Sequence, residues 1–185
     1  MANKNNIRLS KYLCLILRHK PDIIGIDLDE HGWADVTQLL EKMNQSGETI
    51  DLHKLDEVVR NDNKKRFSFN DTLDKIRANQ GHSINIDLGY KAQRPPEYLY
   101  HGTAGRFAES ILRNGIEKKK RHHVHLSPDE ETAIKVGRRH GDPVVFKIAA
   151  GQMHGDGALF YLSNNGIWLT DYVAVKYLCV QNHKK

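Results

Sequence analysis

The sequence predicts an α+β protein of two lobes, and three observations support this. Apolar residues recur at helical spacing in the first half of the chain and in short extended runs in the second. The segment Lys91–Pro96 ends in two adjacent prolines, which disfavour helix and favour a linker. The net charge changes from −1 over residues 1–90 to +6 over residues 91–185. We therefore expect lobes at residues 1–90 and 97–185.

Three helices are predicted in the first lobe. The first runs from about Ser10 to His19 and stops before Pro21. Asp35 and Asp51 are expected to cap the second and third helices, because an aspartate carboxylate accepts hydrogen bonds from free backbone N–H groups. The apolar faces of these helices are expected to be buried through Tyr12, Leu13, Ile16, Leu17, Val36, Leu39, Leu40, Met43, Leu52, Leu55, Val58 and Val59.

A hairpin is predicted to follow the helices. Its strands are residues 66–69 and 75–78, and Asn70, Asp71 and Thr72 supply the turn. Phe67 and Phe69 are expected on the core face of the first strand. Three helices and a terminal hairpin form a winged-helix pattern.

The second lobe is predicted to be a mixed α/β domain with many short strands. Its helices are expected at residues 106–113 and 129–140. Its strands are expected at residues 98–100, 123–126, 144–148, 158–161, 166–169 and 175–180.

Composition excludes several classes of protein. No apolar run approaches the roughly 18 residues that a membrane span needs, and the N-terminus lacks the pattern of a signal peptide, so we expect a cytoplasmic protein with no membrane partner. Cys14 and Cys179 lie in apolar patterns and are expected to be small core residues. The net charge of +5 favours an anionic partner.

Cationic residues of the first lobe gather in two places. Arg18 and His19 end the first helix, where the helix dipole stabilises cations, or they clamp a phosphate. Arg66 begins the hairpin and lies either in a solvated turn or at a phosphate. His82 and Ser83 follow in a loop that could donate to the same phosphate. These residues alone leave both interpretations open.

The second lobe carries a row of polar residues. Strand alternation places Val124 and Leu126 on one face and Arg121, His123, His125 and Ser127 on the other. Such a row either faces water or lines a polar site, because burying it without partners is costly. His123 and His125 could hold zinc, but no further ligand follows at recognisable spacing, so no metal is expected.

Two more segments have both a structural and a functional interpretation. His101, Gly102 and Thr103 end an apolar strand, where they form an ordinary strand-to-helix turn or let the backbone approach a ligand closely. Arg139 and His140 precede a helix-terminating glycine, where they act as C-terminal cations or contact an adenine or a phosphate.

Taken in order, the polar segments resemble one family over nearly the whole chain. They are LRHKP, KKRFSF, RANQGHS, LYHGT, RHHVHLS, VGRRHG and NGIWLT. The series is similar to that of the NAD⁺-dependent tRNA 2′-phosphotransferases, enzymes of tRNA splicing and processing. The resemblance implies an N-terminal winged-helix lobe joined to a C-terminal lobe of the ADP-ribosyltransferase type.

The resemblance also implies roles for individual residues. The family's catalytic Arg-His-Arg-Arg set falls on Arg18, His19, Arg66 and Arg121. Its NAD⁺-binding positions fall on His101, Gly102, Thr103, His125, Ser127, Arg139 and His140, and the residues that could add contacts to the substrate phosphate are His82 and Ser83. Many ADP-ribosyltransferases have a late catalytic glutamate, which this chain lacks after Glu131.

The implied reaction has two steps. An internal RNA 2′-phosphate attacks the nicotinamide ribose of NAD⁺ and expels nicotinamide, which leaves an ADP-ribosylated phosphate on the RNA. The ADP-ribose 2″-hydroxyl then attacks phosphorus, giving 2′-OH RNA and ADP-ribose 1″,2″-cyclic phosphate. We expect a monomer whose site forms in the cleft between the lobes, with RNA held by the first lobe and NAD⁺ by the second.

Two alternatives remain from the sequence. The first is an ADP-ribosyltransferase that modifies nucleic-acid phosphate ends or protein and leaves ADP-ribose attached. The second is a winged-helix DNA-binding protein. The net charge of −1 over residues 1–90 argues against the latter, because nonspecific duplex binding depends on neutralising phosphates.

Overall fold

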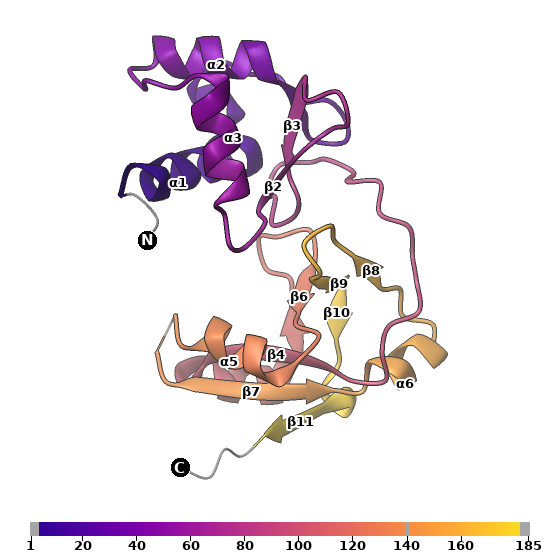
Figure 1. The fold of residues 1–185 in the computed structure, drawn as a ribbon. Coiled ribbons are helices and arrows are strands. Elements are labelled where there is room, and N and C mark those ends of the chain that lie inside the picture. The colour runs from indigo at the N-terminus through magenta and orange to yellow at the C-terminus, as the bar shows by residue number, and fades with distance from the viewer. Residues whose placement is uncertain (1–3, 140, 182–185) are drawn as a thin grey trace. The chain divides into compact units, whose positions relative to one another are not determined.

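The computed structural model describes residues 4–139 and 141–181, in which helices combine with small antiparallel sheets (Figure 1). The chain divides into two compact units, Met1–Gly89 and Tyr90–Lys185, each with its own apolar core. The predicted mixture of helices and short strands is confirmed. Within the described residues no helix has the length and apolar character needed to cross a membrane.

The first unit contains three α-helices and a three-stranded sheet. In chain order its elements are α1 (Lys4–Arg18), η1 (Pro21–Ile23), β1 (Trp33–Asp35), α2 (Val36–Gln45), α3 (Leu52–Arg60), β2 (Phe67–Phe69) and β3 (Lys75–Ala78). The sheet order is β1-β3-β2, and both pairings are antiparallel. The predicted hairpin is confirmed as β2 and β3, with Arg66 lying just before β2.

Both predicted aspartate caps of the first unit are confirmed. The Asp35 carboxylate accepts a hydrogen bond from Gln38 N at 2.8 Å, and Asp51 accepts one from Lys54 N at 2.7 Å. The first helix begins earlier than predicted, at Lys4 instead of Ser10. The additional residues include Leu9, which is fully buried one turn before Leu13, and Arg8, which pairs with Glu48.

The predicted core of the first unit is largely confirmed, with Leu52 as the error. Leu13, Ile16, Leu39 and Leu55 are fully buried, whereas Leu52 is 51% exposed. A helical side chain covers the turn before its own Cα. Leu52 is the first residue of α3, so no preceding turn exists for it to pack over.

The second unit has β7 (Pro143–Ile148) at the centre of its largest sheet, between β4 (Leu99–Ala104) and β11 (Leu178–Gln181). The helix α5 (Glu130–Gly137) packs against β4 and β7. A second sheet orders β6-β9-β8, and a two-stranded sheet pairs β10 with β5. The remaining elements are η2 (Gly105–Phe107), α4 (Ala108–Asn114), β5 (Ile116–Glu117), β6 (Val124–Leu126), α6 (Ala150–Gly155), β8 (Tyr161–Leu162), β9 (Trp168–Thr170), β10 (Tyr172–Val173) and η3 (Val175–Tyr177).

Several predicted boundaries in the second unit were wrong. The strand expected at residues 98–100 extends through Ala104, so His101, Gly102 and Thr103 lie inside β4 and not in a turn after it. The strand expected at residues 175–180 begins as a 3-10 turn. The helix expected at residues 129–140 is α5, which ends at Gly137. Short β5, β10 and α6 were not predicted at all.

Two expectations about single segments also differ from the structure. The segment Lys91–Pro96 is held on the second unit, where Gln93 N donates to Phe160 O at 2.9 Å and Ala92 bridges to Tyr161. Both cysteines are free thiols, but Cys14 is only partly buried and Cys179 is exposed. Cys179 lies on β11, which is an edge strand of its sheet.

Replacing Asp129 with alanine should destabilise the protein by about 1 kcal/mol. The Asp129 carboxylate caps α5, accepting hydrogen bonds from Thr132 N at 2.7 Å and from Thr132 Oγ1 at 2.9 Å. Urea denaturation measures the change. The matched control is Glu131→Ala, which removes an exposed ion pair with Lys135 on the same helix and should cost less than about 0.5 kcal/mol. Equal losses in the two variants would contradict the capping role.

Candidate functional site

The end of α1 places Arg18 and His19 beside a segment that is distant in sequence. Ser83 N donates to Arg18 O at 2.9 Å, and the Ser83 hydroxyl lies 2.9 Å from His19 Nδ1. His19 and Ser83 are exposed, whereas His82 is 1% exposed. The fold therefore presents Ser83 together with Arg18 and His19 and packs His82 inside the unit.

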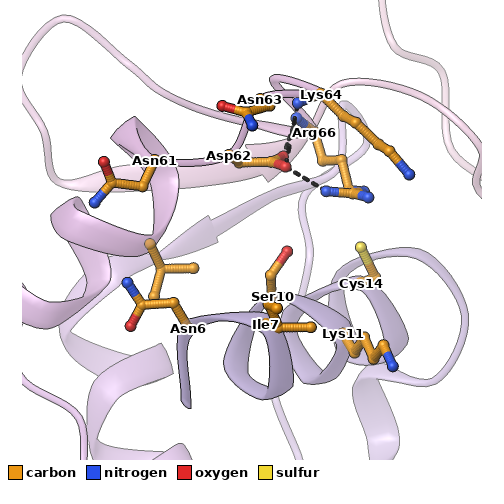
Figure 2. Close-up of a pocket in the computed structure, with 11 residues that line it drawn as sticks. Asn6, Ile7, Ser10, Lys11, Cys14, Asn61, Asp62, Asn63, Lys64 and Arg66 are labelled. Carbon is orange, nitrogen blue, oxygen red and sulfur yellow. Dashed lines mark hydrogen bonds and ion pairs between the residues drawn. The ribbon is translucent and has the colours of Figure 1, made fainter. Parts of the chain in front are cut away.

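Arg66 is positioned by a buried carboxylate that was not predicted. Asp62 forms an ion pair with the Arg66 guanidinium and also accepts a hydrogen bond from Arg66 N at 2.6 Å (Figure 2). The Asp62 side chain is only 4% exposed, so its charge is directed into the loop and not toward solvent. The turn between them requires Lys65 in the left-handed region, with φ of 43°.

Arg18 and Arg66 lie near one thiol, that of Cys14 on α1. Burial raises the pKa of Cys14, and the positive charges of Arg18 and Arg66 partly oppose that rise because they favour the thiolate. Arg18 lies one helical turn after Cys14 on α1, and Arg66 and Cys14 line the same cavity. The fold of the first unit brings together three of the four predicted catalytic residues, Arg18, His19 and Arg66.

A cavity of about 350 Å³ adjoins this cluster, between α1 and the loop that joins α3 to β2 (Figure 2). Arg66 lines it, and Cys14 lines it one helical turn before Arg18. Three of its lining residues are basic and one is acidic. The lining residues are Asn6, Ile7, Ser10, Lys11, Cys14, Val58, Asn61, Asp62, Asn63, Lys64 and Arg66.

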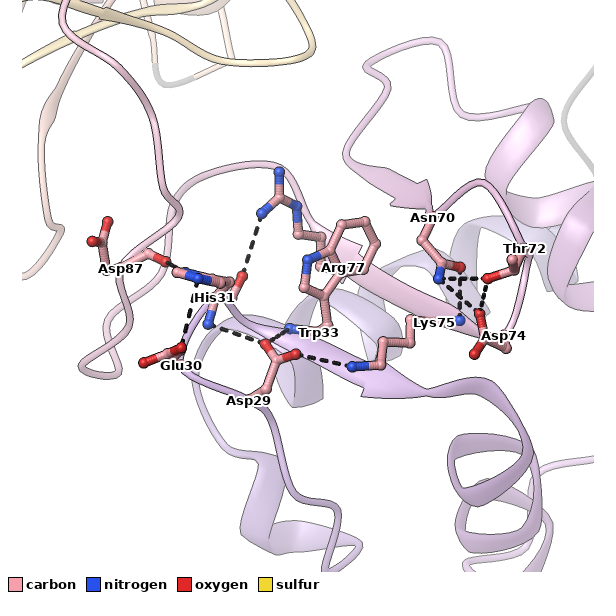
Figure 3. Close-up of polar contacts among 10 residues, drawn as sticks. All are labelled: Asp29, Glu30, His31, Trp33, Asn70, Thr72, Asp74, Lys75, Arg77 and Asp87. Carbon is pink, nitrogen blue, oxygen red and sulfur yellow. Dashed lines mark hydrogen bonds and ion pairs between the residues drawn. The ribbon is translucent and has the colours of Figure 1, made fainter.

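A strap formed by residues 82–89 holds Ser83 in place. Asp87 N donates to Glu30 O at 2.8 Å, and His31 Nδ1 donates to Asp87 O at 2.7 Å (Figure 3). Arg77 stacks over the Trp33 ring at 4.5 Å and donates to Leu88 O at 3.2 Å. The strap is thus anchored at its far end on Glu30 and His31, which precede β1, and on Arg77 of β3.

Further strap residues pack over Gly32. A Cβ at Gly32 would lie 2.6 Å from Ile86 Cδ1 and 3.7 Å from His82 Nε2. Gly32 has φ of 76°, so a larger residue there would be strained as well as crowded. This close approach fixes the middle of the strap, and with it the position of Ser83.

In the second unit, β6 and the residues before it bring Arg121 and His125 together. Val124 and Leu126 are buried and His125 is partly exposed, which confirms the predicted alternation within β6. Arg121 and His123 precede the strand, and Ser127, which was expected in the same polar row, is buried. Arg121 Nη1 lies 3.1 Å from His125 Nδ1. A guanidinium can only donate, so His125 accepts through Nδ1 and carries its ring proton on Nε2 when neutral.

His101 lies beside His125, on the neighbouring β4. His101 Nδ1 lies 3.1 Å from His125 O and donates to it, because a carbonyl oxygen only accepts. Burial lowers the pKa of His101, the carbonyl of His125 partly opposes this, and the charge of Arg121 adds to the lowering. A neutral His101 with its proton on Nδ1 has an unprotonated Nε2 that can accept a hydrogen bond from a hydroxyl.

These residues line a second cavity of about 340 Å³. It contains His101, Arg121, His123 and His125, and three lysines line one side, of which Lys118 pairs with Asp171 and Lys119 with Glu117. Its lining residues are His101, Ile116, Glu117, Lys118, Lys119, Lys120, Arg121, His123, Val124 and His125. A basic cavity that also offers imidazole groups fits a ligand with both phosphates and hydroxyls, such as a dinucleotide.

The stability of the protein should fall as the pH drops below about 6.5, the value for an unperturbed histidine. The unfolded chain can protonate His101 there, whereas the fold lowers the pKa of His101 and keeps it neutral. His101→Asn keeps an N–H near the position of Nδ1 and cannot titrate. The free energy of unfolding of the wild type, measured by urea denaturation, should therefore exceed that of the variant by less at about pH 5 than at pH 7. A constant difference would show that His101 does not carry this dependence.

The other predicted NAD⁺-binding residues do not line the second cavity. Thr103 and Ser127 are buried, and Ser127 exchanges backbone hydrogen bonds with Tyr100 of β4. Gly102 lies against α5, where a Cβ would be 1.7 Å from Ala133 O. The space on this side of Gly102 is therefore filled by the backbone of α5. Arg139 is exposed after α5, and His140 lies outside the described residues.

Some residues of these sites were not predicted from the sequence. Asp62 and the run Lys118–Lys120 were overlooked, since neither has a spacing that marks a site without tertiary contacts. Among the described residues, no three His, Cys, Asp or Glu side chains are grouped so that they could hold a metal ion.

Comparison with known proteins identifies the family. Residues 4–172 match the family described as RNA 2′-phosphotransferase, Tpt1 / KptA. A probable RNA 2′-phosphotransferase of Flavobacterium johnsoniae is 53% identical over 92% of this chain and 93% of its own length. Proteins with the same description from Agrobacterium fabrum and Fusobacterium nucleatum are 52% and 47% identical, covering 92% and 94% of this chain and 92% and 98% of their own. This chain belongs to the RNA 2′-phosphotransferase family.

Proposed function

We propose that this protein transfers an internal RNA 2′-phosphate to NAD⁺, giving 2′-OH RNA, nicotinamide and ADP-ribose 1″,2″-cyclic phosphate. The observation that carries the proposal is the convergence of Arg18, His19 and Arg66 in one unit. Two guanidinium groups and an imidazole suit a phosphate dianion. The adjacent carboxylate of Asp62 is already paired with Arg66 and therefore repels the phosphate little.

The first step needs alignment more than a strong base. A phosphomonoester is largely dianionic near pH 7, since its second pKa is about 6. One of its oxygens forms a bond to the ribose C1″ of NAD⁺, and the bond from C1″ to the nicotinamide nitrogen breaks, with nicotinamide keeping the electron pair. Arg18 and Arg66 hold the phosphate in line for this attack.

The second step needs charge stabilisation and proton transfer. The 2″-hydroxyl oxygen attacks phosphorus and loses its proton, while the bond from phosphorus to the RNA 2′-oxygen breaks and that oxygen gains a proton. The guanidinium groups, including that of Arg121, stabilise the negative charge that develops. His19 is held at Nδ1 by Ser83, so its Nε2 is the atom that can transfer a proton.

We propose that the second unit binds NAD⁺ through its basic cavity. His101 Nε2 accepts from a ribose hydroxyl, and Arg121 with the neighbouring lysines attracts the phosphates. Support comes from the neutral state of His101, because a protonated ring could not accept from a hydroxyl. No role for a metal ion is proposed.

The architecture is also part of the proposal. Three helices followed by the β2–β3 hairpin fit a winged-helix RNA-binding lobe, and the two antiparallel sheets around β4 and β6 fit a lobe of the ADP-ribosyltransferase type. We propose that the enzyme acts as a monomer on tRNA or another RNA that bears an internal 2′-phosphate.

One experiment tests the function directly. The full chain is incubated with NAD⁺ and a short oligonucleotide that bears an internal 2′-phosphate, and the products are resolved by mass spectrometry. We expect 2′-OH RNA and ADP-ribose cyclic phosphate in equal amounts. Stable ADP-ribosylated RNA would instead indicate a transferase that stops after the first step. No consumption of NAD⁺ would contradict both enzymatic functions and leave nucleic-acid binding as the alternative.

A further inference from the structure

We propose that the cavity along α1 binds the single-stranded RNA that flanks the 2′-phosphorylated nucleotide. The inference rests on the proposed function for the identity of the substrate. It assigns a role to residues outside the catalytic set, chiefly Lys11, Asn63 and Lys64.

One face of α1 forms a continuous wall of this cavity. Ile7, Lys11 and Cys14 line it at spacings of four and three residues, and Arg18 follows Cys14 by four. Lys11 and Arg18 are two turns apart, about 10 Å along the helix. Lys11 therefore supplies a second cation on the same helix face, where it can contact the next phosphodiester of a strand whose 2′-phosphate is held by Arg18.

The opposite wall is the loop between α3 and β2, and it is also basic. It contributes Asn61, Asn63, Lys64 and Arg66. The one lining carboxylate, Asp62, has a buried side chain and pairs with Arg66, so it presents little negative charge to a ligand. Both walls therefore offer cations and amide groups, which bind phosphate and ribose oxygens.

The dimensions and the apolar part of the lining favour a nucleotide strand. A volume of about 350 Å³ lies at the lower end of ligand sites, which span roughly 300–1,000 Å³. Ile7 lines the cavity with 47% of its surface exposed. This exposed aliphatic side chain offers an apolar surface to the face of a base within a basic groove.

The first test compares the salt dependence of RNA binding. The full chain without NAD⁺ is titrated with a 2′-phosphorylated RNA decamer and with a 2′-phosphorylated dinucleotide, using fluorescence anisotropy. Lys11→Ala should weaken decamer binding about fivefold and lower the log–log salt slope by about 0.7, because one phosphate contact is lost. Dinucleotide binding should not change.

The matched control is Lys42→Ala, which removes a helix lysine of the same unit that does not line the cavity. It should leave both affinities and the slope as in the wild type. An unchanged slope for Lys11→Ala would overturn the proposal, as would equal effects of Lys11→Ala and Lys42→Ala. The proposal would also be overturned if poly-glutamate of matched charge displaced the labelled decamer as well as unlabelled RNA does. The cavity would then be a general anion site.

A second test locates the strand through the two free cysteines. Cys14 lines the cavity, whereas Cys179 is exposed on β11 of the other unit. Bound decamer should slow the alkylation of Cys14 by iodoacetamide at least about threefold at alkaline pH, where thiolate forms, and leave Cys179 unchanged. Unprotected Cys14 would contradict occupancy of this cavity.

The two proposals fail in different ways. If the wild type forms no product from a 2′-phosphorylated RNA, the proposed function is wrong, and the salt slope and the protection of Cys14 still report whether RNA occupies the cavity. If the wild type forms product while Lys11→Ala keeps its slope and Cys14 stays unprotected, the enzyme is confirmed and the strand runs elsewhere.

Discussion

Alanine in place of Gly102 is expected to destabilise the second unit by at least about 3 kcal/mol, the upper range for overpacking a core. The added Cβ would lie 1.7 Å from Ala133 O, 2.5 Å from its carbonyl carbon and 3.1 Å from its Cα. All three atoms belong to the backbone of α5. No side-chain rotation can relieve the overlap, so α5 has to move away from β4.

The matched control is Gly155→Ala. Gly155 ends the short helix α6, and a Cβ there would meet nothing within 4 Å. Alanine lowers the entropy of the unfolded chain and has the better helix propensity, so this variant should be stabilised by about 0.5–1 kcal/mol. Thermal and urea denaturation of both variants, followed by circular dichroism, give the comparison.

Wild-type stability of the Gly102 variant would show that α5 does not rest on the backbone of β4. Activity alone is not a sufficient measure, because His101 is the adjacent residue and lines the basic cavity. If the Gly102 variant stays folded but loses NAD⁺ binding, the result would support the predicted contact between Gly102 and a ligand.

Gly102 also shows what the sequence could and could not predict. A glycine within an apolar strand indicates that something approaches closely, but not whether it is a ligand or a helix. The neighbour here is α5, which lies about thirty residues later in the chain. Helix packing is decided by the whole sheet, so the pattern around Gly102 could not distinguish the two.

Features that depend on local chemistry were predicted correctly. Asp35 and Asp51 cap their helices as expected, because a cap needs only the residue and the next turn. The alternation around His125 was also predicted, since strand geometry places every second side chain on one face. Arg121 precedes β6, so its hydrogen bond with His125 depends on the bend at residues 121–123 and not on strand alternation.

Features that depend on distant contacts were missed. The strand β1 has three residues and exists because it pairs with β3. The carboxylate of Asp62 gains its role only when the loop folds back on Arg66. Ser83 was considered as a phosphate ligand, but its hydrogen bond with His19, 64 positions earlier, could not be inferred from spacing.

Replacing Arg121 with alanine is expected to lower turnover of a 2′-phosphorylated RNA at least about 100-fold, which corresponds to about 2.7 kcal/mol of barrier. Its guanidinium is exposed on one side and held by His125 Nδ1 at 3.1 Å on the other. An arginine oriented in this way can align a phosphate without reorganising during the reaction. The melting temperature should stay close to that of the wild type, because Arg121 is exposed.

Two further variants separate charge from geometry. Arg121→Lys keeps the positive charge but lacks the planar guanidinium group. Its turnover should fall by less than that of the alanine variant, yet by well over tenfold. Arg113→Ala removes an exposed arginine of the same unit that pairs with Glu109, and it should be fully active. Activity of Arg121→Ala within about threefold of the wild type would remove this residue from the catalytic set.

Single-turnover kinetics would also show in which step Arg121 acts. If alanine slows mainly the attack on phosphorus, ADP-ribosylated RNA should accumulate while nicotinamide is released at the normal rate. If the variant slows the attack on ribose C1″, nicotinamide release and product formation should fall together, with no intermediate. Because the phosphate must be held in both steps, equal slowing of both would mean that Arg121 positions the substrate and does not favour either transition state.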